Sequence, residues 1–215
     1  MVIRTKKELH FCLMADYMMS RGSFRKTLKE RLKCLMRPDP SIEYLRCMRK
    51  LSYYKYKNNP LWVYYHSKYM RLGVQLGYTI GPDSCGYGLV LPHYGTLIIG
   101  SKNAIGNYAM IHVGTLFTSD ERTVGDNLYV ATGAKITTGM HIGNNVTIAA
   151  NSVVTKSFDD DNILLAGMPA VVKGRRGPWW EGNEEFFMRH KRCEELRAKM
   201  FGSKLSLASK ETQII

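Results

Sequence analysis

The chain has 215 residues, 45% of them hydrophobic, and carries 31 lysines and arginines against 18 acidic residues, a formal net charge of +13. This length suits one core plus an additional segment. No apolar run approaches the roughly 18 residues of a membrane span, and the first residues lack the apolar centre of a signal peptide, so we expect a cytoplasmic protein. Without a CxxC pair, the cysteines predict neither a disulfide framework nor a zinc knuckle. We expect buried thiols at Cys12, Cys34, Cys47, Cys85 and Cys193.

Residues 1–78 are predicted to form a basic helical region, with 17 lysines and arginines against 5 acidic residues. Pro38 and Pro40 separate a first helical stretch from a second, and Asn58–Pro60 separates the second from a third over Leu61–Leu76. The positive charge could attract an anionic membrane surface, at the inner face of the membrane, or a phosphorylated substrate, or it could belong to solvated helix faces. Because no nucleic-acid-binding module is recognisable, we expect no nucleic acid partner.

Residues 79–174 contain a repeat in which aliphatic or aromatic residues return every six positions. A period of six fits neither a helix nor a simple strand, but it is typical of a parallel β-helix with short strands on three faces. The chain is therefore predicted to be mainly β, with helical segments at both ends. Two steps are longer, eight residues from Leu91 to Ile99 and seven from Phe117 to Val124, and we expect the chemistry there. The regular positions are Ile99, Ile105, Ile111, Phe117, Val124, Val130, Ile136, Ile142, Ile148 and Val154.

Residues 175–215 are predicted to form a third segment, with a helix over about Asn183–Phe201. Asn183 is suited to cap that helix, and Glu184 and Glu185 favour its first turn through the helix dipole.

Two stretches carry a family resemblance. Gly86–Gly100 contains His93 within its eight-residue step, and Ala166–Gly174 reads AGMPAVVKG. Both resemble the left-handed β-helix hexapeptide-repeat acyltransferases, and the first is similar to the serine acetyltransferase branch. The resemblance implies a left-handed β-helix, acetyl-CoA as co-substrate and His93 as catalytic base. Imidazole, whose ordinary pKa is about 6.5, suits the removal of an alcohol proton.

A second histidine follows one coil later. The run Ile105–Leu116, which contains Ile111-His112-Val113-Gly114, looks like the variant found in acetyltransferases of capsular and lipopolysaccharide gene clusters. Counting faces along the repeat places His93 and His112 on adjacent coils near the same edge. His112 is therefore a second catalytic candidate, as a donor to the developing oxyanion, with a structural role as the alternative.

The sequence also departs from the serine branch. Pro92 stands where that branch has an aspartate that contacts the amino-acid substrate, and residues 118–123 lack its longer loop with a second histidine. The candidates for substrate binding are Tyr94 and, unless they only form a charged corner, Asp120 and Glu121. From these departures we expect an O-acetyltransferase acting on a sugar or glycan hydroxyl in surface-polysaccharide biosynthesis. Serine O-acetyltransferase in cysteine biosynthesis and a non-catalytic trimeric β-helix scaffold are the alternatives.

The resemblance also implies an assembly. In this family coenzyme A lies in a groove between neighbouring subunits, which implies a homotrimer or a dimer of trimers joined by the N-terminal helices. His141 falls on a different face from His93 and His112, so we expect no metal site of the kind found in the γ-class carbonic anhydrases. The candidates for contact with the pantetheine arm have small side chains, and those for its phosphates are cationic: Ala131, Gly133, Ala149 and Ala150, and then Lys156, Lys173 and Arg175.

Overall fold

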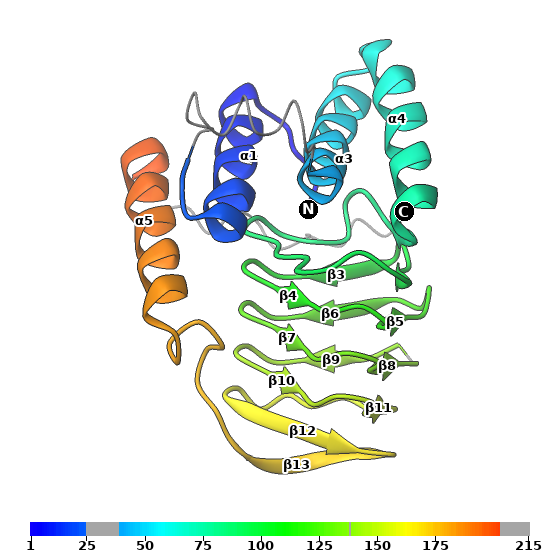
Figure 1. Cartoon of the computed structure of the whole chain (residues 1–215), viewed down its shortest axis with the longest axis vertical. Helices are drawn as coiled ribbons and strands as arrows, with labels where there is room; N and C mark the ends of the chain where they lie inside the picture. Colours follow the sequence, from blue (N-terminus) through cyan, green and yellow to red (C-terminus); the bar gives the residue numbers. More distant parts are fainter. Residues whose placement is uncertain (25–38, 138, 203–215) are drawn as a thin grey trace, which may run out of the picture.

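The computed structural model describes residues 1–24, 39–137 and 139–202. A stack of β coils has helices at one end and a further helix along one side (Figure 1). Asn183 caps the last helix by accepting a hydrogen bond from the Phe186 backbone N–H, as predicted. The helices are α1 (Lys6–Arg21), α3 (Pro40–Tyr56), α4 (Leu61–Leu76) and α5 (Glu184–Phe201).

The short strands form three sheets that run along the stack. Sheet A contains β1 (Tyr78–Ile80), β2 (Leu97–Ile99), β5 (Leu116–Phe117), β8 (Lys135–Ile136) and β11 (Val153–Val154). Sheet B contains β3 (Asn103–Ile105), β6 (Arg122–Val124) and β9 (His141–Ile142). Sheet C contains β4 (Met110–Ile111), β7 (Tyr129–Val130), β10 (Thr147–Ile148), β12 (Ile163–Gly167) and β13 (Ala170–Arg175). Strands of successive coils pair in parallel, whereas β13 returns antiparallel to β12. The predicted left-handed hexapeptide β-helix is confirmed.

The interior of the coils is filled by the repeat positions. All ten residues that keep the six-residue period are buried, because each ends a short strand and points inward. Ile99 pairs with Phe117 and Phe117 with Ile136, which are steps of 18 and 19 residues. The eight-residue step is the turn from sheet C to sheet A in the first coil, and the seven-residue step is a turn from sheet A to sheet B.

The turns from sheet B to sheet C form a polar column that the C-terminal segment covers. Asn127 donates from its side-chain amide to Asn145 (2.8 Å), and Asn145 donates to Asn162 (2.9 Å). All three adopt positive φ angles near 56–59°, which asparagine tolerates better than most residues. The Trp180 indole donates to Asn127 (2.9 Å), and its ring stacks on His190 of α5 at 3.9 Å. These contacts hold α5 against the coils.

A buried ion pair joins the helices to the first coil. Arg49 of α3 is fully buried, and its Nε donates to Asp16 of α1 at 2.8 Å. The same guanidinium donates to the carbonyls of Cys85 (2.8 Å) and Gly86, while Asp16 accepts from the Leu89 backbone N–H (3.1 Å). Two helices and the loop before the His93 turn are thereby held by one set of hydrogen bonds.

The cysteines and the helices bear on further predictions made from the sequence. Four of the five cysteines are free and buried as expected, and Cys34 lies outside the described residues. Over the described ranges, the helices are too short or too polar to cross a membrane. The division into segments 1–78, 79–174 and 175–215 stays a prediction.

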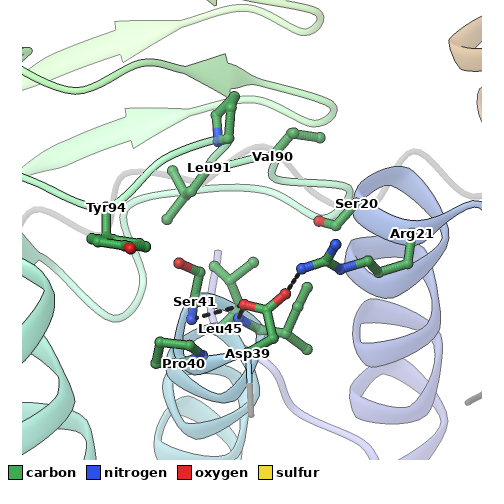
Figure 2. Close-up of a pocket in the computed structure, with 11 residues that line it drawn as sticks. Ser20, Arg21, Asp39, Pro40, Ser41, Leu45, Val90, Leu91 and Tyr94 are labelled. Carbon is green, nitrogen blue, oxygen red and sulfur yellow. Dashed lines mark hydrogen bonds and ion pairs between the residues drawn. The ribbon is translucent and has the colours of Figure 1, made fainter. Parts of the chain in front are cut away.

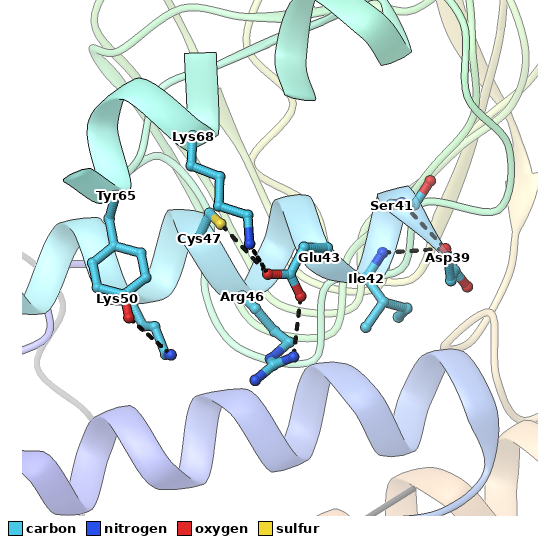
Figure 3. Close-up of polar contacts among 9 residues, drawn as sticks. All are labelled: Asp39, Ser41, Ile42, Glu43, Arg46, Cys47, Lys50, Tyr65 and Lys68. Atoms are coloured by element: carbon cyan, nitrogen blue, oxygen red, sulfur yellow. Dashed lines mark hydrogen bonds and ion pairs between the residues drawn. The ribbon is translucent and has the colours of Figure 1, made fainter. Parts of the chain in front are cut away.

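Replacing Arg49 by methionine should lower the free energy of unfolding by about 3–5 kcal/mol, because the Asp16 carboxylate would stay buried without its countercharge. Denaturant unfolding followed by circular dichroism measures this change. Arg46→Met is the matched control: Arg46 lies on the same helix and pairs with Glu43 at 3.0 Å on an exposed face (Figure 3). That variant should lose less than about 1 kcal/mol. Equal losses in the two variants would contradict the role given to Arg49.

Candidate functional site

One edge of the coils brings the predicted catalytic and cofactor residues together. Here the chain turns from sheet C to sheet A, at residues 91–96, 112–115, 131–134 and 149–152. We call this column of four turns the histidine edge. It contains both candidate histidines and all four small residues predicted to face the pantetheine arm.

His93 and His112 lie one above the other on this edge. Their ring centroids are 6.4 Å apart, and His93 is exposed while His112 is half-buried. The His112 Nε2 atom is buried without a hydrogen-bond partner among the described residues, and the ring also lies 5.3 Å from that of Tyr129. Burial, and after it the neighbouring His93, lower the pKa of His112 below its ordinary value. His112 is therefore neutral at physiological pH.

The His93 turn is fixed by a side chain rather than by backbone pairing. Within the described chain, the backbone groups of residues 91–94 make no hydrogen bonds to other backbone groups. The Tyr78 hydroxyl instead donates to the His93 carbonyl at 2.7 Å. Because a phenol has one proton, Ser41 of α3, 3.4 Å away, must donate to the Tyr78 oxygen. Burial raises the pKa of Tyr78, which keeps the phenol a donor.

The lower turns of the histidine edge present small side chains. Ala131 and Ala149 are half-buried and Ala150 is exposed, so the backbone of these turns can be approached from outside. Gly133 has a further reason to be glycine: its φ is +79°, and an added Cβ would collide with the Asn151 side chain.

A pocket of about 350 Å³ opens beside the His93 turn (Figure 2). Pro92 and Tyr94, the residues on either side of His93, form part of its wall. The rest comes from Val90 and Leu91 of the same coil, from the end of α1, including Arg21, and from the start of α3 with its cap Asp39. The lining residues are Ser20, Arg21, Asp39, Pro40, Ser41, Ile42, Leu45, Val90, Leu91, Pro92 and Tyr94. Tyr94 is thus the predicted substrate residue that reaches this pocket.

Other predicted residues lie elsewhere in the single chain. Asp120 and Glu121 occupy the turn from sheet A to sheet B, at the far end of β5 from the histidine edge, and Asp120 accepts a hydrogen bond from Thr118 (2.8 Å). Lys156 lies in another turn after sheet A, and Lys173 is exposed on β13. Arg175 lies at the opposite end of sheet C, where it donates to the Asp161 carbonyl at 3.0 Å. One subunit therefore does not gather these cations at the small residues.

His141 is placed on sheet B, apart from the histidine edge. Its Nδ1 lies 2.8 Å from the Thr123 hydroxyl. The three histidines therefore do not converge within the chain, as the face count predicts.

Four residues that the sequence patterns did not identify contribute to this region: Arg21, Asp39, Ser41 and Tyr78. The dipeptide Asp39–Pro40 does carry a signal, since an N-cap aspartate followed by proline is typical of a helix start. No pattern indicates that the end of α1 lies beside it.

No family model matches the chain. It is 32% identical to a serine acetyltransferase from Synechococcus elongatus in a 99-residue alignment that covers 43% of this chain and 40% of that protein. It is 37% identical to a serine acetyltransferase from Staphylococcus aureus in a 96-residue alignment that covers 41% of this chain and 45% of the relative. An acyl-[acyl-carrier-protein]–UDP-N-acetylglucosamine O-acyltransferase from Paraburkholderia xenovorans is 38% identical over 56 residues, 26% of this chain and 21% of that protein. The chain thus spans less than half the length of these curated relatives.

Solved structures extend the likeness beyond the repeat. Serine acetyltransferase from Neisseria gonorrhoeae superimposes with a TM-score of 0.63 at 20% identity, over 84% of this chain and 72% of that one. A serine acetyltransferase in complex with CoA gives a TM-score of 0.61 at 20% identity, over 78% and 70%. At these identities the superposition shows the fold.

The expected sugar or glycan acceptor, and with it a role in surface-polysaccharide biosynthesis, is contradicted by these comparisons. Serine acetyltransferases match at the level of both sequence and fold, which favours the alternative stated for the sequence. Pro92 and the short turn at residues 118–123 are local changes within an otherwise similar set of coils, so they do not outweigh this likeness. The chain is a left-handed β-helix protein of the hexapeptide-repeat type, with the fold of the serine acetyltransferases.

Proposed function

We propose that this chain is an acetyl-CoA-dependent serine O-acetyltransferase in which His93 is the general base. The observation that carries the proposal is the histidine edge: His93 and His112 lie 6.4 Å apart, above a column of small residues and beside a pocket. The likeness to serine acetyltransferases, one of them solved with CoA, supports the choice of substrates.

His93 supplies the proton transfer. In this proposal its imidazole takes the proton of the serine hydroxyl while the oxygen attacks the thioester carbon. The bond from carbon to sulfur then breaks, and the proton can pass from His93 to the departing thiolate. This reaction forms no covalent bond to the protein and therefore needs no nucleophilic side chain. His93 is exposed beside the pocket, where both substrates can reach its imidazole.

His112 is suited to a different task. A neutral imidazole with a free, buried Nε2 can donate a hydrogen bond where negative charge develops in the transition state. Because His112 is neutral, it also places no positive charge beside His93 when His93 takes up the proton. The Thr115 hydroxyl donates to the His112 carbonyl at 2.7 Å and holds this turn in place.

The small residues of the edge fit the narrow arm of coenzyme A. When bound, acetyl-CoA supplies an activated acetyl thioester. Ala131, Ala149 and Ala150 leave the backbone of successive turns open to a chain-like ligand. Lys156, Lys173 and Arg175 stay candidates for its phosphates from a neighbouring subunit, since one chain does not bring them to this edge.

The assembly proposed with this function is a homotrimer. A second subunit placed along the histidine edge would complete a groove that the single chain leaves open. A dimer of trimers, a cytoplasmic location and association with an anionic membrane surface stay predictions from the sequence.

Purified protein should release free thiol from acetyl-CoA when L-serine is added, as followed by a thiol-reactive dye. His93→Ala should lower this rate by about 10²–10⁴-fold, because the general base is lost. His141→Ala, which removes an exposed histidine on sheet B, should leave the rate within about twofold. An unchanged rate in His93→Ala would rule out its assignment as base. Failure to bind acetyl-CoA would instead favour the non-catalytic scaffold.

Tyr78→Phe should lower kcat about 3- to 10-fold, the value of one lost hydrogen bond, because the His93 turn loses its hydroxyl anchor. The KM for acetyl-CoA should not change. Tyr44→Phe is the matched control: Tyr44 is buried in the same aromatic cluster, with its ring 5.2 Å from that of Tyr78, but does not contact the turn. A similar fall in kcat for both variants would show a general packing effect rather than positioning of His93.

His112 should also make stability depend on pH. Because its pKa is lowered in the folded state, the unfolded chain binds more protons below the ordinary value of about 6.5. The free energy of unfolding should therefore fall as pH is lowered from 7 towards 5, and His112→Gln should remove that component. His10→Gln, at an exposed position of α1, should retain it. Parallel pH dependences for wild type and His112→Gln would contradict a buried, neutral His112.

A further inference from the structure

The pocket beside the His93 turn has a charged wall that the proposed chemistry does not use. Arg21 is the last residue of α1, and Gly22 ends that helix in the left-handed conformation. The Arg21 guanidinium pairs with the Asp39 carboxylate, as a dashed line in Figure 2 shows, and both residues line the pocket. Among the described residues that line the pocket, Arg21 carries the positive charge.

Asp39 is held firmly, and Arg21 is not. One Asp39 oxygen accepts from the backbone N–H groups of Ser41 (3.1 Å) and Ile42 (3.3 Å), which caps α3 (Figure 3). The other oxygen faces the guanidinium. The Arg21 side chain is 52% exposed against 20% for Asp39, so it can reorient while the carboxylate stays fixed. A guanidinium has five N–H donors, and pairing with Asp39 through Nη2 leaves others available.

The remaining lining is uncharged. Ile42 and Leu45 of α3 and Val90 and Leu91 of the first coil give the pocket apolar lining on two sides, which weakens solvent screening of a charge placed between them. Pro92 and Tyr94, the chain neighbours of His93, line the same pocket. A small acceptor held at the wall therefore lies next to the turn that carries the base.

We propose that Arg21 binds the α-carboxylate of the acceptor amino acid and so determines specificity for it. This inference rests on the proposed function. A planar guanidinium binds a carboxylate through two parallel hydrogen bonds, which an amide or a bare hydroxymethyl group cannot reproduce. Asp39 orients the guanidinium. Arg21, Asp39 and Pro92 line the same pocket, so a carboxylate bound by the pair lies beside the His93 turn.

The test compares L-serine with L-serinamide, which keeps the hydroxyl and the ammonium group but lacks the carboxylate. Arg21→Gln should raise the KM and the Kd for L-serine about 10- to 100-fold, the range of a charge-assisted hydrogen bond. Kinetics with L-serinamide and the KM for acetyl-CoA should stay within about twofold. Calorimetric titration gives the Kd without turnover. Arg46→Gln, which removes an exposed arginine of α3 outside the pocket, is the matched control and should bind L-serine like the wild type.

Several outcomes would overturn the proposal: unchanged affinity for L-serine in Arg21→Gln, or equal losses for L-serine and L-serinamide, which would indicate a structural role. Wild-type protein that does not bind L-serine would overturn it together with the proposed function. Binding of L-serine that is weakened in Arg21→Gln but never followed by acetylation would support the carboxylate site and contradict the acetyltransferase.

Discussion

Each coil hydrogen-bonds to the next in parallel register, so that Ile98 pairs with Leu116 and Leu116 with Lys135. This constraint places residues about one coil apart in the sequence directly above one another. Three edges result, and each gathers one kind of residue: asparagines on one, charged and threonine side chains on another, and histidines above alanines and glycines on the third. A site built on such an edge is made of residues 17 to 20 positions apart, and its spacing is set by the backbone.

Helices α1 and α3 supply the residues that lie beside the first coil. Arg49 is buried among carbonyls and the Asp16 carboxylate, so α1 and α3 cannot shift without exposing or isolating a charge. The same packing brings the end of α1 and the start of α3 to the pocket wall. The ion pair therefore has an indirect influence on function, since it fixes where Arg21, Asp39 and Ser41 stand relative to His93.

The period of six predicted the coils because one inward residue per step is a strictly local rule. It also predicted which histidines share an edge, because each six-residue step moves the chain to the next of the three faces. The contact of Tyr78 with the His93 carbonyl and the approach of Arg21 to Asp39 could not be predicted this way. Both depend on how helices dock onto the first coil, which a repeat pattern does not encode. The choice of acceptor failed for a related reason: one altered residue, Pro92, and one short turn, at residues 118–123, say little about a pocket built from two helices and the first coil.

The antiparallel return of β13 along β12 has a consequence for association between molecules. A parallel solenoid that simply stopped would offer its last coil as a template on which another chain could add strands, the usual route to fibre growth. Here the final strand, β13, runs antiparallel to β12, and it carries the exposed residues Lys173 and Arg175. Such a terminus disfavours end-to-end polymerisation and leaves the sides of the coils as the surfaces through which subunits can assemble.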